Sequence, residues 1–199
     1  MKIVGLTGGI GSGKSVVAGF LSACGAQCLD TDRVAREVVA PNSEGWRKIV
    51  DRFGAAVLQS SGELDRDTLA KIVFADPAAR RELEAITHPL IFQAVHRWLI
   101  EQLHAGVAVA VLEIPLLFEV DVPYSFNATI CVVAERSVRL ERIRRRSGYD
   151  ETTLAGILDA QMDQQEKAAR ADYVIDNSGT LDTTQKAVEE IFRKIAADA

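Results

Sequence analysis

A glycine-rich segment near the start of the chain has the composition of a loop that binds phosphate groups. Residues 8–15 read GGIGSGKS and fit the pattern G-x-x-x-x-G-K-[ST] in full. Glycines let the backbone curl so that successive N–H groups converge on phosphate oxygens, and a lysine adds a mobile positive charge. A serine hydroxyl at the last position suits magnesium. We therefore expect ATP to bind at Gly9, Gly11, Ser12, Gly13, Lys14, Ser15 and Val16, with Lys14 also catalytic and Ser15 a ligand of Mg²⁺.

Two carboxylates, Asp30 and Asp32, follow the next apolar run of the chain. If this segment is extended, both side chains point to the same side. Such a pair can orient an acceptor hydroxyl, accept its proton and help to hold the metal shell. The alternative is that Asp32 only caps or opens a helix at Arg33. Beside a phosphate-binding loop we favour the catalytic interpretation, with Asp32 rather than Asp30 as the base.

Residues 136–146 hold six arginines and one glutamate in a chain whose net charge is −5. Arg142 and Arg146 are four residues apart and share one face of a helix. Arginine forks bind oxyanions bidentately and can offset the charge that develops during phosphoryl transfer. We expect both residues to bind ATP and Arg142 to act in catalysis. For Arg139, Arg144 and Arg145, a solubilising surface is an equally good interpretation.

Strand and helix patterns alternate around these residues. Continuous apolar or β-branched runs predict buried strands, and the intervening segments have helical patterns. The predicted strands are 2–7, 27–30, 107–114, 128–134 and 173–176, and the predicted helices between them are 14–24, 33–39, 136–146, 151–170 and 182–197. This order predicts an α/β fold with a parallel five-stranded sheet flanked by helices, and ligands at the carboxyl ends of the strands.

The stretch from about 42 to 104 contains no strong strand pattern. Helices are expected at 44–53, at 66–75 and after Asp76, which is a plausible N-cap because Pro77 follows it. We interpret this stretch as a helical insertion into one domain of 199 residues.

The bulk composition disfavours several kinds of partner. The acidic net charge argues against nonspecific nucleic-acid binding. The longest apolar runs, such as 107–112, are far shorter than the roughly 20 residues of a membrane span, so we expect a cytoplasmic protein with no membrane anchor. Nothing implies an obligate protein partner. Cys24, Cys28 and Cys131 form no C-x-x-C pair and are expected to be reduced thiols, and His96 and His104 are expected on a solvated helix face.

These residues together resemble the dephospho-coenzyme A kinase family, over nearly the whole chain. The matching motifs are LTGGIGSGKS at 6–15, Asp30-Thr31-Asp32 with Ala35-Arg36, His88-Pro89, PLLFE at 115–119, Gln161 and ADYVIDN at 171–177. Two positions depart from the family pattern. Val16 stands where a threonine is frequent, and Glu113 stands where an aspartate often ends the third strand; neither removes a needed group, because Ser15 keeps the hydroxyl and Glu113 keeps a carboxylate.

The resemblance implies a P-loop NTPase-type core at 1–40, 105–135 and 171–199, a coenzyme A-binding insertion at about 41–104 and a lid at about 136–170. It implies transfer of the γ-phosphate of ATP to the ribose 3'-hydroxyl of dephospho-coenzyme A, with Mg²⁺ as cofactor. By position, Asp32 resembles the base, Arg142 and Arg146 resemble lid arginines, and Asn177 is expected to bind ATP. The expected acceptor residues are Thr7, Asp30, Asp32, Arg36, His88 and Leu116.

Two rival functions remain to be weighed against this one. Shikimate kinase also combines a phosphate-binding loop with an Asp-x-Asp after the second strand, but a glycine triplet for its acceptor would be expected, and Gly8-Gly9 is the only pair of adjacent glycines. A regulatory GTPase would carry an Asn-Lys-x-Asp motif, which is absent. The Asp-x-x-Gly at 51–54 lies in the helical insertion rather than after a strand.

Overall fold

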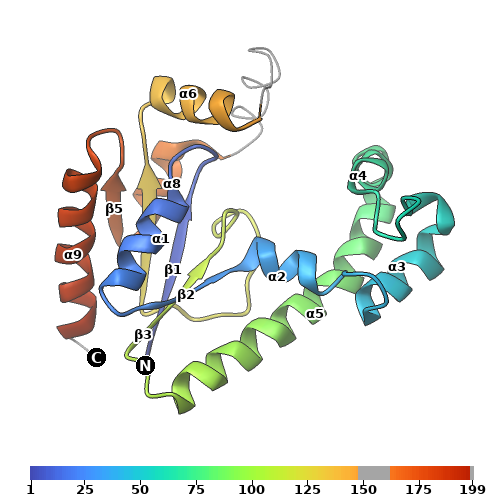
Figure 1. The fold of residues 1–199 in the computed structure, drawn as a ribbon, viewed down its shortest axis with the longest axis horizontal. Helices are drawn as coiled ribbons and strands as arrows, with labels where there is room; N and C mark the ends of the chain where they lie inside the picture. Colours follow the sequence, from blue (N-terminus) through green and yellow to red (C-terminus); the bar gives the residue numbers. More distant parts are fainter. Residues whose placement is uncertain (148–161, 198–199) are drawn as a thin grey trace. The chain divides into compact units, whose positions relative to one another are not determined.

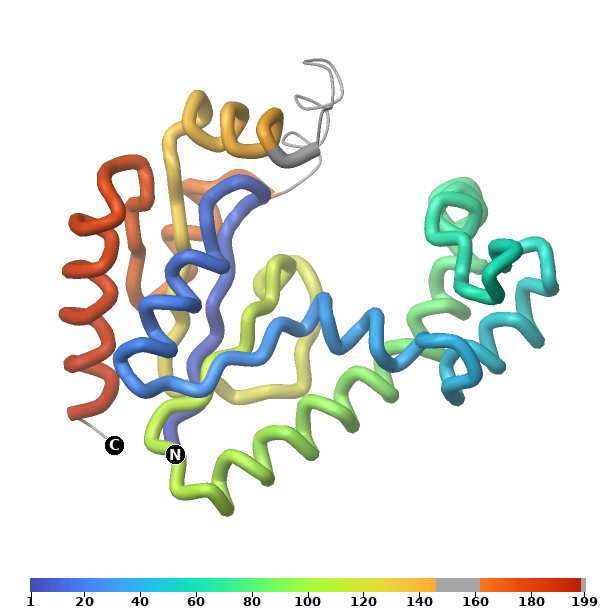
Figure 2. The backbone as a smooth tube through the Cα atoms, in the orientation of Figure 1, coloured from blue at the N-terminus to red at the C-terminus, as the bar shows by residue number. Residues whose placement is uncertain are grey.

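The chain divides into two units that are each described by themselves. The computed structural model describes residues 1–147 and 162–197, without the side chains of 146 and 147. One unit, here called the core unit, contains Met1–Asp30 and Gln102–Ala199, and the other, the helical unit, is Thr31–Glu101. The helical unit therefore begins earlier than the boundary near residue 41 that the sequence suggested. Figure 2 shows the chain leaving the core unit after residue 30 and returning along one long helix.

A parallel sheet of five strands forms the centre of the core unit (Figure 1). Its order is β2-β3-β1-β4-β5, and every neighbouring pair is parallel, as the sequence predicted. The carboxyl ends of parallel strands meet at one edge, so the residues after them are brought together. The strands are β1 (Lys2–Gly8), β2 (Gln27–Asp30), β3 (Val109–Glu113), β4 (Ala128–Val133) and β5 (Tyr173–Asp176).

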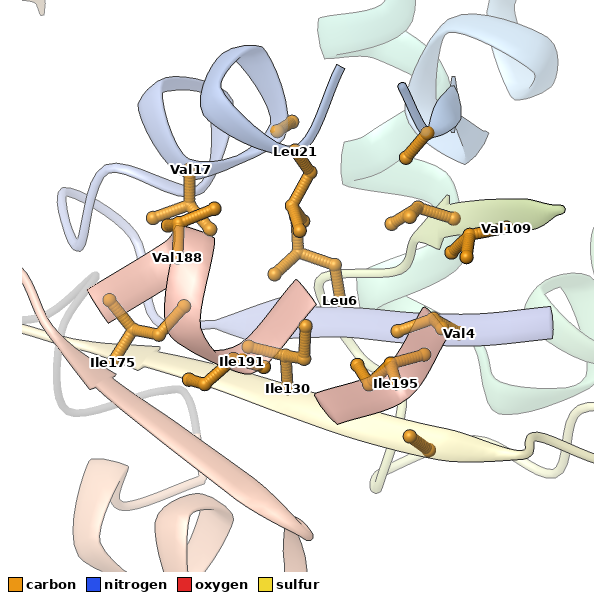
Figure 3. Packing of buried hydrophobic residues seen from close by; sticks show 14 of the residues in the cluster. Val4, Leu6, Val17, Leu21, Val109, Ile130, Ile175, Val188, Ile191 and Ile195 are labelled. Carbon is orange, nitrogen blue, oxygen red and sulfur yellow. The ribbon is translucent and has the colours of Figure 1, made fainter. Parts of the chain in front are cut away.

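Helices α1 (Lys14–Ala23) and α9 (Leu181–Ala197) pack on one face of this sheet. Figure 3 shows Leu21 of α1 pointing toward Leu6 of β1, and Val17 of α1 beside Val188 of α9. These side chains are at most 1% exposed, and burying each one is worth about 1.5–3 kcal/mol. The cluster therefore holds the start of α1 firmly at the end of β1. Two further helices of the core unit are α6 (Arg136–Ser147) and α8 (Gln164–Arg170).

Helix α8 corrects the prediction of one continuous helix over 151–170. Asp163 is not helical, and its carboxylate accepts hydrogen bonds from the backbone N–H groups of Gln165 and Glu166. A new helix therefore begins at Gln164. The signal was present in the sequence, because Asp163 and Glu166 have the spacing of a capping box. The part of the prediction over 151–161 lies outside the described residues.

The helical unit has a small apolar core of its own. Its elements are α2 (Thr31–Glu37), α3 (Glu44–Phe53), the short 3₁₀ helix η1 (Ala55–Val57), α4 (Arg66–Ala75) and α5 (Pro77–His104), whose last turn belongs to the core unit. Buried side chains Ile49 and Val57 form its centre with their neighbours. Asp76 caps α5 as predicted, with its carboxylate 2.8 Å from the Ala78 nitrogen. Within the described ranges, no helix has the length and apolar character needed to cross a membrane.

Candidate nucleotide and acceptor site

The loop between β1 and α1 has a conformation that requires glycine. Gly11 and Gly13 have φ angles of 76° and 91°, in the left-handed region that side chains disfavour. Space is limiting as well, because a Cβ on Gly13 would lie 2.1 Å from the amide nitrogen of Asn177. The same addition at Gly11 would meet the carbonyl oxygen of Arg139 at 2.8 Å. The glycines therefore allow both the turn and the close approach of two other segments.

Asn177 is one of the side chains that fix this loop. Its amide nitrogen donates to the carbonyl oxygen of Ser12 at 2.8 Å, and its amide oxygen accepts from the hydroxyl of Thr184 at 2.9 Å. The residue is 1% exposed. The structure thus places Asn177 against the predicted ATP-binding loop, with its amide used to hold loop backbone.

Two arginines of α6 hold the loop from another direction. Arg142 donates to the carbonyl oxygens of Ser12, at 3.2 Å, and of Asn177, at 2.8 Å. Arg139 donates to the carbonyl oxygen of Ile10 at 2.9 Å. The bonds to Ser12 and Ile10 place two guanidinium charges at the loop, where they would attract an oxyanion.

Arg139 is not part of a solubilising surface, which corrects that alternative. The residue is 9% exposed. Burial lowers the pKa of its guanidinium, and repulsion from Arg136 adds to the effect. By contrast, Arg144 and Arg145 are exposed, and Arg145 pairs with Glu141 of the same helix. The side chain of Arg146 lies outside the described residues.

The start of α1 completes a site suited to an anion. Gly13 occupies the N-cap position and no side-chain hydrogen bond caps this helix, so its positive end faces the loop. The ammonium group of Lys14 lies 2.6 Å from the carbonyl oxygen of Gly8. No described residue bonds the buried hydroxyl of Ser12, and Ser15 is exposed in the first turn. The loop and the first turn of α1 therefore present backbone dipoles, the Lys14 ammonium and the exposed Ser15 hydroxyl close together in the chain.

Carboxylates end the two strands on one side of β1, namely β3, which pairs with β1, and β2, which lies beyond β3. Asp30 at the end of β2 stands in register with Glu113 at the end of β3. Asp32, however, lies in the first turn of α2, which begins directly after Asp30. The expected extended Asp30-Thr31-Asp32 segment, with both carboxylates on one side, is therefore wrong. The helix starts at Thr31 rather than at Arg33.

Three other residues predicted to bind the acceptor, Asp32, Arg36 and His88, belong to the helical unit. Asp32 and Arg36 are exposed on α2. His88 is half-buried in α5, where its ring centroid lies 5.7 Å from that of Phe92. As expected, His96 and His104 are exposed. The structure thus places Asp32, Arg36 and His88 within the helical unit, and it places the phosphate-binding loop within the core unit.

Two predicted acceptor residues remain, Leu116 and Thr7. Leu116 lies in the segment after β3 and is 43% exposed. Thr7, also predicted at the acceptor, is fully buried and donates its hydroxyl to the carbonyl oxygen of Pro115 at 3.1 Å. The ammonium of Lys167 donates to the same carbonyl at 2.8 Å and pairs with Glu119 at 2.6 Å. The sequence analysis missed Lys167, because it lies in a strongly polar helical stretch of the kind that is usually exposed.

The residues near the loop fit a sparsely coordinated magnesium ion. No cluster of three histidine, cysteine or acidic side chains that could hold a metal occurs in the parts of the chain that the structure describes. Mg²⁺ in kinases typically keeps several waters and uses one or two protein oxygens together with phosphate oxygens. The Ser15 hydroxyl, with the carboxylates that end β2 and β3, is a donor set of that kind.

A parallel sheet in the order β2-β3-β1-β4-β5, with a glycine loop between β1 and α1 that is braced by arginines, defines a nucleotide-binding protein of the P-loop class. A shikimate kinase from Acinetobacter baumannii shares this fold, with a TM-score of 0.52 at 15% identity over 100% of this chain and 94% of that one.

The chain belongs to the dephospho-CoA kinase family, whose model, described as dephospho-CoA kinase, matches residues 2–183. A dephospho-CoA kinase from Frankia casuarinae is 44% identical over 99% of this chain and 85% of its own length. One from Geobacter sulfurreducens is 42% identical over 98% of each chain. The solved dephospho-CoA kinase of Campylobacter jejuni is similar with a TM-score of 0.71 and 25% identity over 98% of each chain.

Proposed function

We propose that this kinase transfers the γ-phosphate of ATP to the ribose 3'-hydroxyl of dephospho-coenzyme A, giving coenzyme A and ADP. The observation that carries the proposal is the phosphate-binding loop, whose backbone is braced by Arg139, Arg142 and Asn177 in a chain of this family. A loop that is already shaped loses little conformational entropy when a triphosphate binds. It also keeps its N–H dipoles aimed at one place during the reaction.

The loop supplies the electrostatic part of catalysis. Backbone N–H groups and the start of α1 bind phosphate oxygens, and Gly9, Gly11, Ser12, Gly13 and Val16 contribute through their backbone. Lys14 adds a positive charge that stabilises negative charge on the transferred group. Arg142, whose guanidinium already lies at the loop, acts with it, and Arg146 follows one turn later on α6.

Asp32 acts as the base on the acceptor side. The 3'-oxygen forms a bond to the γ-phosphorus while the bond from that phosphorus to the bridging oxygen of ADP breaks. The hydroxyl proton passes to the Asp32 carboxylate, and ADP leaves with the electron pair of the broken bond. Asp30, Arg36, His88 and Leu116 bind the acceptor.

We assign Thr7 to a supporting role rather than to direct contact with the acceptor. Its hydroxyl is buried and bonded to the Pro115 carbonyl, so it acts through the segment that carries Leu116. Likewise, Asn177 acts on ATP through the loop backbone that its amide holds. The helical insertion at about 41–104 binds the coenzyme A part of the acceptor, and the region at about 136–170 acts as a lid.

Magnesium is the expected cofactor, with Ser15 as its protein ligand. A bound Mg²⁺ neutralises charge on the β- and γ-phosphate oxygens during transfer. The protein is expected to work in the cytoplasm without an obligate protein partner, and its three cysteines, all free thiols, suit a reducing compartment.

Product analysis tests the proposal directly. The protein is incubated with ATP, Mg²⁺ and dephospho-coenzyme A, and coenzyme A and ADP are measured by mass spectrometry. We expect equal amounts of both products, and none without Mg²⁺. The Lys14→Ala variant is the matched control for a contaminating kinase. A clear preference for shikimate or a nucleoside monophosphate as acceptor would overturn the proposed substrate while leaving the nucleotide site intact.

A further inference from the structure

A lysine that the reaction does not use is completely buried beside the segment after β3. Lys167 of α8 is 0% exposed, although a lysine is almost never fully buried unless it is paired. Its ammonium contacts two groups of one short segment, residues 115–119: the Pro115 carbonyl oxygen at 2.8 Å and the Glu119 carboxylate at 2.6 Å. The Glu119 side chain is 19% exposed. The ammonium charge of Lys167 is therefore satisfied by the Glu119 carboxylate and the Pro115 carbonyl oxygen.

The contacted segment is joined to the strand that leads into the phosphate-binding loop. The Pro115 carbonyl also accepts from the hydroxyl of Thr7, which immediately precedes Gly8. One carbonyl oxygen thus receives hydrogen bonds from β1 and from α8. Burial raises the pKa of the Cys131 thiol to about 11, and the charges of Lys167 and Lys14 both oppose this rise. Both ammonium charges therefore act on the same thiol of β4.

Helix α8 is itself anchored, so it can act as a fixed support. Gln164 accepts a hydrogen bond from the Ala134 nitrogen at the end of β4, at 3.0 Å. At the other end of the helix, Arg170 donates to the Phe118 carbonyl oxygen at 3.4 Å. Two cations of one short helix thus bond two carbonyl groups of residues 115–119.

We infer that Lys167 is a positioning residue that holds residues 115–119, and with them Leu116, in the place required to bind the acceptor. The inference rests on the proposed function for the identity of the acceptor. A buried ion pair is costly to form, because both groups lose water, and removing one partner is strongly destabilising. The Pro115 bond gives this pair a use beyond stability, because it fixes the backbone of the residue before Leu116, which we assign to the acceptor site.

Three variants separate positioning from simple stabilisation: Lys167→Met, Glu119→Gln and the double variant that carries both changes. Each single change leaves a charge without its partner and should lower Tm by several degrees. The double variant removes both charges and should recover most of that loss. It does not restore the bond to the Pro115 carbonyl, so its KM for dephospho-coenzyme A should stay raised about tenfold, with the KM for ATP nearly unchanged. Lys194→Met, which removes an exposed Lys194–Glu190 pair on α9, is the control and should change neither KM.

Amide hydrogen exchange gives a second measurement that needs no substrate. The amides of Leu117 and Glu119 are hydrogen-bonded within the segment, to the carbonyl oxygens of Ile114 and Leu116. They should exchange faster in Lys167→Met and in the double variant than in the unaltered protein. If the unaltered protein fails to phosphorylate dephospho-coenzyme A, the proposed function fails while the exchange result still tests the support of the segment. A double variant with a normal KM for dephospho-coenzyme A, or with unchanged exchange of these amides, would overturn the inference.

Discussion

The phosphate-binding loop and the helix α2 present their predicted functional groups in different ways. The loop is held by three buried or half-buried side chains of its own unit. Arg139, Arg142 and Asn177 each donate a hydrogen bond to a carbonyl oxygen of the loop. Asp32 and Arg36 instead stand exposed on a short helix of the helical unit. The predicted nucleotide site thus has its shape without ATP, whereas the predicted acceptor groups on α2 are exposed side chains. Substitutions in the two regions should therefore separate effects on ATP from effects on the acceptor.

The largest effect is expected from the acceptor side. Asp32→Asn keeps the size of the side chain and removes its charge and basicity. If Asp32 takes the proton of the 3'-hydroxyl, kcat should fall by about 10²- to 10⁴-fold, the usual contribution of a general base. ATP affinity, measured by titration calorimetry, should be close to normal, because the loop is untouched.

Asp30→Asn is the matched control for that substitution. Asp30 ends β2 in the core unit, so its loss should weaken the handling of Mg²⁺ and ATP, or stability, more than acceptor chemistry. A near-normal kcat in Asp32→Asn would leave Asp32 as a residue of the first turn of α2 and nothing more.

The next largest effect should come from the loop lysine. Lys14→Ala removes the ammonium that lies 2.6 Å from the Gly8 carbonyl and should reduce turnover by about 10²- to 10³-fold. Arg142→Ala should also lose turnover, because its guanidinium lies at the loop. Steady-state kinetics with dephospho-coenzyme A measures both.

The control for these two cations is the double change Arg144→Ala and Arg145→Ala. Both side chains are exposed, and one is paired only with Glu141. Turnover should fall much less. Equal losses in all three proteins would show that the choice of arginines on α6 is wrong.

A smaller and more specific effect should follow from reshaping the loop. Gly13→Ala forces a side chain into a φ of 91° and against Asn177, and backbone strain of this kind costs about 1–3 kcal/mol. ATP affinity should fall by about 10- to 100-fold, measured by titration calorimetry. Gly25→Ala is matched in backbone strain, with a φ of 104°, but its Cβ would meet no atom within 4 Å. Gly25→Ala should lower Tm and leave ATP affinity intact; the same loss of affinity in both variants would show that the crowding at Gly13 is irrelevant.

The smallest effect is expected within the helical unit. Ser43 caps α3, with its hydroxyl oxygen accepting from the Trp46 nitrogen at 3.1 Å. Ser43→Ala should cost about 1 kcal/mol and lower Tm by about 2–4 °C in calorimetry, without changing the KM for ATP. Ser43→Thr keeps a hydroxyl for the cap and should recover most of the loss. A normal Tm in Ser43→Ala would mean that this cap contributes nothing to the helical unit.

Much of the fold could be predicted, because its signals are local. The strands β1, β3 and β4 lie in continuous apolar runs, and α3 and α4 begin and end where the sequence pattern placed them. Errors arose at helix starts that hydrophobic spacing does not show. Asp163 starts α8 in the middle of a predicted helix, and α2 starts at Thr31, which ends the extended segment expected at Asp30 to Asp32.

By itself the sequence determined the order of the strands and helices, the glycine loop and its phosphate-binding character, because each depends on residues within a few positions of one another. Only the tertiary structure decided which polar side chains support the site. Arg139 reaches the carbonyl of Ile10 across 129 residues of sequence, and Lys167 reaches that of Pro115 across 52. Both residues lie in strongly charged stretches that resemble solvated helices. Their burial follows from carbonyl groups that other segments present to them, and that pairing exists only once the sheet has brought those segments together.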